Sequence, residues 1–211
     1  MATKSSSTIP GWAFAVGGVA VLALALLVAW LTAGEGGDRP SVAEIAGAPV
    51  VEGETLPVAG DPADDPSVGQ PAPTVQGEGF DGEPITIGES EQPELLVFMA
   101  AWCPHCQDEL TELVAFVEDG RVPDDVRLTA VVTGLDDTRD NWPPDAWFED
   151  EGWTGPVIVD DADSSIAEAY GQPGTPYWVA IDGDGQIAAR VSGRLPMETV
   201  DLVLDDLAGT A

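Results

Sequence analysis

Residues 95–106, Leu-Leu-Val-Phe-Met-Ala-Ala-Trp-Cys-Pro-His-Cys, join a continuous apolar run to a pair of cysteines. The run 95–99 has the length of a β-strand and no polar alternation, which predicts a strand buried on both faces. Beyond the cysteines, apolar residues recur at helical spacing at Leu110, Leu113, Val114 and Val117. This spacing predicts a helix that ends near Gly120. The cysteines therefore lie at a predicted strand-to-helix junction.

The chain after residue 72 alternates between strand-like and helix-like segments. The turn pair Asp81-Gly82 separates segments 74–76 and 84–87, which predicts a β-hairpin. Further strands are expected at 126–132 and 156–159, helices at 145–151 and 164–170, a second hairpin from 177–181 and 187–191, and an amphipathic helix at 197–207. This order predicts an α/β domain over 73–211, with a central mixed β-sheet flanked by helices.

The spacing of Cys103 and Cys106 has a chemical consequence. At a helix N-terminus, unpaired backbone N–H groups and the helix dipole stabilise the Cys103 thiolate, and Cys106 lies one turn further on, within reach for a disulfide. Pro104 suits the first helical turn, because the N–H that it lacks is unpaired there. His105 can lower the pKa of the nucleophile further by its charge or a hydrogen bond. The pair is therefore predicted to be redox-active.

The N-terminal part of the chain predicts a membrane anchor. Residues 11–33 carry no charge and would span about 34 Å as a helix, enough to cross a bilayer. Lys4 precedes this segment, which predicts a cytoplasmic tail at 1–10 and a domain outside the cytoplasm. Residues 34–72 are acidic and rich in Gly and Pro, which predicts a flexible linker. A single-pass protein of the cell membrane is expected, with a cleaved signal peptide as the alternative.

The charge balance limits the partners. Acidic residues number 38 against 7 basic ones, giving a formal net charge of −31. Such a chain would repel nucleic acid and an anionic membrane surface, so neither is an expected partner. The stretch 141–153 holds much of the domain's aromatic content, including Trp147, Phe148 and Trp153. Packing in the core is the expected role of these rings, and docking of a partner or substrate is the alternative.

Two motifs together resemble the thioredoxin superfamily: Trp102-Cys103-Pro104-His105-Cys106 after an apolar strand, and Gly174-Thr175-Pro176 before another. The anchor, the linker and the opening hairpin look most like the membrane-tethered TlpA/ResA group, which is often grouped with redoxin and AhpC/TSA domains. The resemblance covers about residues 70–208. It departs at Val97, where many thioredoxins carry a buried aspartate.

The resemblance implies roles for individual residues. Cys103 would be the attacking thiol, Cys106 the resolving thiol and Pro176 a cis-proline packed beside the disulfide. Thr175, by its backbone, and Trp102 would bind the substrate. Glu109, three residues after Cys106, would take a proton from that thiol, although a solvated helix acid is an equally good interpretation of this residue.

The expected function is thiol–disulfide exchange with proteins outside the cytoplasm, without a bound cofactor or metal, and with a membrane redox partner that resets the pair. The direction stays open, because the Pro-His dipeptide resembles that of the oxidising DsbA proteins and the tethered architecture resembles reductants of cytochrome c maturation. Three alternatives are an inert disulfide, a copper-binding module and a peroxiredoxin-like peroxidase. Ala100 disfavours the peroxidase, since peroxiredoxins have a threonine or serine three residues before their reactive cysteine.

Overall fold

The apolar run before the cysteines forms the middle strand of a five-stranded sheet in the computed structural model, which describes residues 39–88 and 92–209. The strand order is β6-β5-β4-β7-β8. Strands β4 and β5 are parallel to each other and to β6, whereas β7 is antiparallel to both β4 and β8. The strands are β4 (Glu94–Met99), β5 (Arg127–Val132), β6 (Val157–Val159), β7 (Tyr177–Ile181) and β8 (Ile187–Ser192). The predicted mixed central sheet is confirmed.

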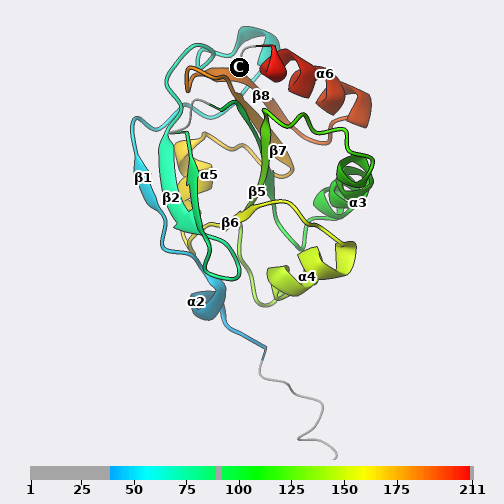
Figure 1. Ribbon diagram of the computed structural model, residues 1–211. Helices are drawn as coiled ribbons and strands as arrows, with labels where there is room; N and C mark the ends of the chain where they lie inside the picture. Colours follow the sequence, from blue (N-terminus) through cyan, green and yellow to red (C-terminus); the bar gives the residue numbers. More distant parts are fainter. Residues whose placement is uncertain (1–38, 89–91, 210–211) are drawn as a thin grey trace, which may run out of the picture. The chain divides into compact units, whose positions relative to one another are not determined.

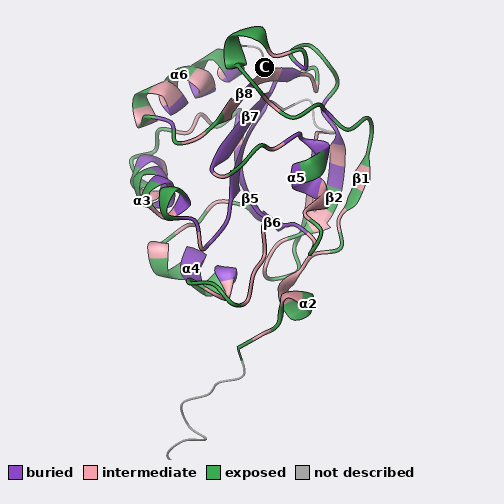
Figure 2. Cartoon of the chain, turned by 180° about the vertical axis from the view of Figure 1, so that it is seen from behind, coloured by how far each residue is buried: buried purple, intermediate pink, exposed green. Residues whose placement is uncertain are grey.

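Layers on both faces bury the central sheet (Figure 1). Helices α3, α4 and α6 lie on one face, and α5 lies on the other together with a smaller sheet. Their bounds are α3 (Pro104–Glu118), α4 (Pro144–Glu151), α5 (Ser165–Ala169) and α6 (Met197–Ala208). Every residue of β4 is buried, as is most of the central sheet (Figure 2). Alternate side chains of β4 pack into two separate hydrophobic cores, one on each face of the sheet. Val97 packs with α3 and α6, whereas Leu96 and Phe98 pack on the α5 side.

The smaller sheet is antiparallel, in the order β1-β2-β3. It contains β1 (Val50–Glu52), β2 (Thr74–Glu78) and β3 (Pro84–Ile87). Strands β2 and β3 form the predicted hairpin, and Gly82 in its loop has a φ of +78°, which glycine adopts without strain. Strand β1 was not expected, because it is short and lies within the stretch predicted as a linker.

The prediction of a flexible linker over 34–72 is wrong from Pro40 onward, because the described residues from Pro40 onward form one compact unit. Residues 40–72 include α2 (Val42–Ile45) and a 3₁₀ turn, η1 (Pro62–Asp64). Just after η1, the Asp65 carboxylate forms two hydrogen bonds with the Arg190 guanidinium of β8, at 2.7 and 2.6 Å. The same guanidinium donates to the Pro57 carbonyl at 2.9 Å. A buried ion pair therefore holds the segment against the central sheet.

The expected anchor at 11–33 and the tail at 1–10 lie outside the described residues. Among residues 39–88 and 92–209, no helix is long and apolar enough to span a bilayer.

Candidate active site

The two cysteines lie where β4 gives way to α3. Cys103 has extended backbone dihedrals (φ −81°, ψ 117°) and forms the N-cap of α3, with Pro104 as the first helical residue. Cys103 is buried except for a small exposed fraction of the residue (7%), whereas Cys106 is fully buried (0%). Both are free thiols in this structure. Only Cys103 is therefore open to a substrate before the pair reacts.

The second motif lies against the first, as the sequence predicts. The Thr175–Pro176 peptide bond is cis, and the Cys103 thiol is 3.5 Å from the Thr175 carbonyl oxygen. Thr175 is half-buried and Pro176 is buried beside it. The structure thus brings together Cys103, Thr175 and Pro176 from segments more than 70 residues apart.

The surroundings shift the pKa values of the two thiols in opposite directions. Burial acts to raise the pKa of Cys103, but hydrogen bonds from the Thr175 side chain and from the backbone N–H groups of Cys106 and His105 outweigh it, so this pKa lies below its usual value. Burial raises the pKa of Cys106 to about 12, and the adjacent Cys103 sulfur adds to the effect. A thiolate forms more readily than usual at Cys103 and far less readily at Cys106.

This difference predicts the pH dependence of alkylation. In the reduced chain, iodoacetamide is expected to modify Cys103 with a midpoint below about pH 8.5, the ordinary value for cysteine, because the thiolate is the reacting form. Cys106 should stay unmodified throughout this range. Peptide mass spectrometry after timed alkylation measures both sites. Preferential alkylation of Cys106, or a Cys103 midpoint above the ordinary value, would contradict this assignment.

Trp102 is held in place from several sides. Its indole Nε1 donates to the Gly134 carbonyl at 2.7 Å, and the Arg139 guanidinium lies 4.6 Å from the centre of its ring. The neighbouring Ala101 carbonyl accepts hydrogen bonds from Gln107 and Asn141, at 3.0 and 3.1 Å. The loop after β5 therefore supports the cysteine motif. No local pattern in the sequence indicates this support, because the loop lies more than 30 residues further along the chain.

His105 is exposed in the first turn of α3. The contact from this residue that favours the Cys103 thiolate is its backbone N–H. The role predicted for its imidazole stays a prediction.

Glu109 is fully buried (0%) on α3 and is not a solvated surface acid. One carboxylate oxygen accepts from the Leu195 backbone N–H at 3.0 Å, and the other accepts from the Arg194 guanidinium at 3.1 Å. Burial raises the pKa of Glu109, although these two hydrogen bonds act against the rise. The carboxylate thus ties α3 to the segment before α6, and its role as a proton acceptor for Cys106 stays a prediction.

A Glu109→Gln variant tests that role. If Glu109 takes the proton from Cys106, the amide should slow release of the mixed disulfide about tenfold or more near neutral pH, since general-base catalysis contributes at least this much. The measurement is the pH profile of the release rate in stopped-flow exchange. Glu112→Gln is the control, because Glu112 binds the same arginine at 2.7 Å from an exposed position. A pH profile unchanged in both variants would show that Glu109 does not take the proton from Cys106. Its role would then be limited to its hydrogen bonds with Arg194 and Leu195.

The described residues contain no group of three or more His, Cys, Asp or Glu side chains placed to hold a metal ion. The copper-binding alternative therefore gains no support from the geometry in this part of the chain.

The fold and the paired cysteines beside a cis-proline define a redoxin of the thioredoxin superfamily. The family model described as "AhpC/TSA family" matches residues 68–190, which is more than half of the chain. The chain therefore belongs to the AhpC/TSA family.

Individual relatives agree with this family. The chain is 32% identical over 130 residues to "Methylamine utilization protein MauD" of Methylophilus methylotrophus, covering 59% of this chain and 56% of that protein. It is 27% identical over 147 residues to "Thiol:disulfide interchange protein HelX" of Rhodobacter capsulatus, covering 68% and 78%. The crystal structure of StoA from Bacillus subtilis superimposes with a TM-score of 0.53 at 24% identity, covering 65% of this chain and 98% of that one. At 24% identity, the similarity to the StoA structure supports the fold alone. The chain spans a little over half the length of MauD.

Proposed function

We propose that this protein is a thiol–disulfide oxidoreductase that exchanges the Cys103–Cys106 pair with protein substrates outside the cytoplasm. The observation that carries the proposal is the unequal environment of the two thiols: Cys103 caps α3, keeps a small exposed fraction and ionises readily, whereas Cys106 is buried and protonated. An inert structural disulfide does not require two thiols that differ in exposure and acidity. HelX, whose printed name describes thiol:disulfide interchange, supports the same function.

The reaction needs two displacements. The Cys103 thiolate attacks a substrate disulfide, forms a mixed disulfide and releases one substrate thiolate. Cys106 then loses its proton and attacks the Cys103 sulfur, which closes the Cys103–Cys106 disulfide and releases the second substrate thiolate. The substrate gains two electrons and the pair loses two. The same steps in reverse oxidise a substrate dithiol.

Substrate chains are proposed to bind along Thr175. Its backbone lies beside the Cys103 sulfur, and its carbonyl oxygen is within 3.5 Å of it. A substrate segment that pairs with this backbone would present its own sulfur to Cys103. Trp102, fixed by Gly134 and Arg139, would form a neighbouring wall.

The lowered pKa of Cys103 favours the oxidising direction, because it stabilises the reduced form of the pair as an anion. Equilibration of the full chain with mixtures of reduced and oxidised glutathione measures the reduction potential. We expect a value closer to about −120 mV, typical of DsbA, than to about −270 mV, typical of thioredoxin. A value near that of thioredoxin would instead assign the protein to the reductants, while leaving exchange itself intact.

The location is part of the proposal. Residues 11–33 are uncharged and long enough to anchor the chain, with Lys4 on the cytoplasmic side. An oxidising compartment is where a disulfide of this kind would persist. A second, membrane-bound redox protein would then restore the pair after each turnover. Protease treatment of spheroplasts and of inside-out membrane vesicles tests the orientation: the domain should be digested in spheroplasts and protected in the vesicles.

A further inference from the structure

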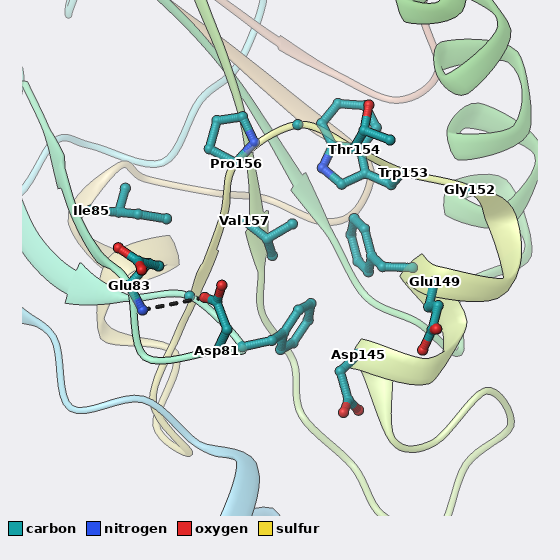
Figure 3. A pocket seen from close by; sticks show the side chains of 14 residues that line it. Asp81, Glu83, Ile85, Asp145, Glu149, Gly152, Trp153, Thr154, Pro156 and Val157 are labelled. Atoms are coloured by element: carbon teal, nitrogen blue, oxygen red, sulfur yellow. Dashed lines mark hydrogen bonds between the residues drawn. The ribbon is translucent and has the colours of Figure 1, made fainter.

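A groove of about 690 Å³ lies between the β2–β3 hairpin, α4 and the segment that enters β6 (Figure 3). We call it the α4 groove. Neither cysteine lines it. Its residues 154–157 lead into the N-terminal end of β6, whereas Cys103 follows the C-terminal end of the parallel strand β4. The α4 groove is therefore a separate feature from the cysteine site, and its volume suits several side chains of a ligand.

Three aromatic residues from different segments form the apolar lining. Phe80 and Phe148 have ring centres 5.8 Å apart, and Phe148 and Trp153 have theirs 6.4 Å apart. Phe148 is buried, whereas Phe80 and Trp153 are half-buried and face the groove. A Cβ at Gly155 would lie 2.5 Å from the Trp153 ring, so the indole packs directly on this glycine. The aromatic surfaces are thus held in place before any ligand arrives.

Four exposed carboxylates belong to the same lining: Asp81, Glu83, Asp145 and Glu149. In Figure 3 the first two come from the hairpin and the other two from α4. Asp81 accepts a hydrogen bond from the Glu83 backbone N–H at 3.2 Å. None of the four forms an ion pair within the described ranges 39–88 and 92–209, where Arg121, Arg127, Arg190 and Arg194 pair with other acids. Negative charge therefore lies beside aromatic faces without a matching cation from these residues.

We infer that the α4 groove binds a basic segment of a partner protein, with an arginine or lysine placed over the half-buried rings of Phe80 and Trp153. Cations are attracted to aromatic faces, most strongly where carboxylates add to the field. A second copy of this chain is a poor occupant, since each copy has a net charge of −31. This inference goes beyond the exchange reaction, because the α4 groove could hold a partner whichever way electrons flow at Cys103.

The test uses calorimetry of the full chain, held in neutral detergent, with the peptide acetyl-Arg-Leu-Arg-Leu-amide. We expect saturable binding that weakens about tenfold or more when Asp81, Glu83, Asp145 and Glu149 are changed to their amides, and that weakens with added salt. Phe80→Leu keeps the apolar bulk but removes one aromatic face, and should weaken binding about threefold. The matching peptide with glutamine in place of arginine should not bind measurably to any of these proteins.

The control variant neutralises four exposed acids elsewhere: Glu118→Gln, Glu198→Gln, Asp205→Asn and Asp206→Asn. It should bind the arginine peptide as tightly as the unchanged chain. Equal weakening in both quadruple variants would overturn the inference, because overall charge would then explain binding. Tetramethylammonium binding as tight as peptide binding would also overturn it, in favour of a small-cation site. Neither readout depends on the cysteines, so failure here is distinguishable from failure of the exchange proposal.

Discussion

Replacing Cys103 by serine is expected to reduce thiol–disulfide exchange about a thousandfold or more. A hydroxyl at this position does not ionise near neutral pH, and removing a catalytic nucleophile typically costs at least this factor. Cys106 cannot replace it, because it is fully buried and its pKa is raised to about 12. The measurement is the rate of insulin reduction by the chain with dithiothreitol as electron source.

Cys106→Ser is the matched variant, since it changes one sulfur of the same pair. It should still attack substrate through Cys103 but fail to release it, so turnover stops at the mixed disulfide. Equal residual activity in Cys103→Ser and Cys106→Ser, with both well above background, would contradict the assignment of attacking and resolving thiols. Urea midpoints of both variants close to that of the reduced, unchanged chain would show that the loss is chemical and not a loss of folding.

The second large effect is on stability. Asp65→Asn should lower the free energy of unfolding by about 3 kcal/mol, because it leaves Arg190 as a buried charge without its partner. Both side chains are essentially inaccessible, with 1% and 0% exposed for Asp65 and Arg190. The guanidinium would keep its hydrogen bonds to the carbonyls of Pro57 and Tyr170, at 2.9 and 3.1 Å, but would lose the carboxylate. Urea unfolding at neutral pH measures the change.

Asp64→Asn is the control, because Asp64 is the exposed neighbour of Asp65 at the end of η1. This change should stay within about 0.5 kcal/mol of the unchanged chain, as is usual for surface positions. Similar losses in both variants would show that the ion pair does not hold the N-terminal segment.

The stabilisation from Asp65 should also depend on pH. The hydrogen bonds to Arg190 hold the pKa of Asp65 below its usual value. A carboxyl with a depressed pKa in the folded state contributes stability above its unfolded pKa of about 3.9, and this contribution is lost as the pH falls through the folded value. The difference between the unchanged chain and Asp65→Asn should therefore be constant above about pH 5 and shrink below about pH 4.

The sequence predicted the elements around the cysteines because their signals are local. The run 95–99 and the helical spacing from Leu110 to Val117 each lie within one element, and the structure has β4 and α3 there. The cis form of Pro176 was predicted as well, but only through the family resemblance. No spacing along the chain indicates that Thr175 meets Cys103, since 72 residues separate them.

Features that depend on distant partners were missed. Residues 40–72 resemble a linker because they lack apolar periodicity, yet Asp65 binds a residue 125 positions away. Glu109 likewise depends on Arg194, 85 positions along the chain, which no local pattern reveals. In the aromatic stretch 141–153, Trp147 and Phe148 pack in the core as expected, whereas Trp142 and Trp153 are half-buried. The α4 groove was missed, because Phe80 joins these residues from the hairpin.

The most direct test of the proposed function is the identity of the sulfur that first bonds to substrate. The Cys106→Ser chain would be incubated with a disulfide-containing peptide, quenched with acid and digested, and its mixed disulfides located by mass spectrometry. A stable mixed disulfide is expected on Cys103, formed faster as the pH rises toward the pKa of this thiol. If Cys103 forms no mixed disulfide, and the unchanged chain exchanges no faster than a Cys103→Ser/Cys106→Ser chain, the proposed function is wrong.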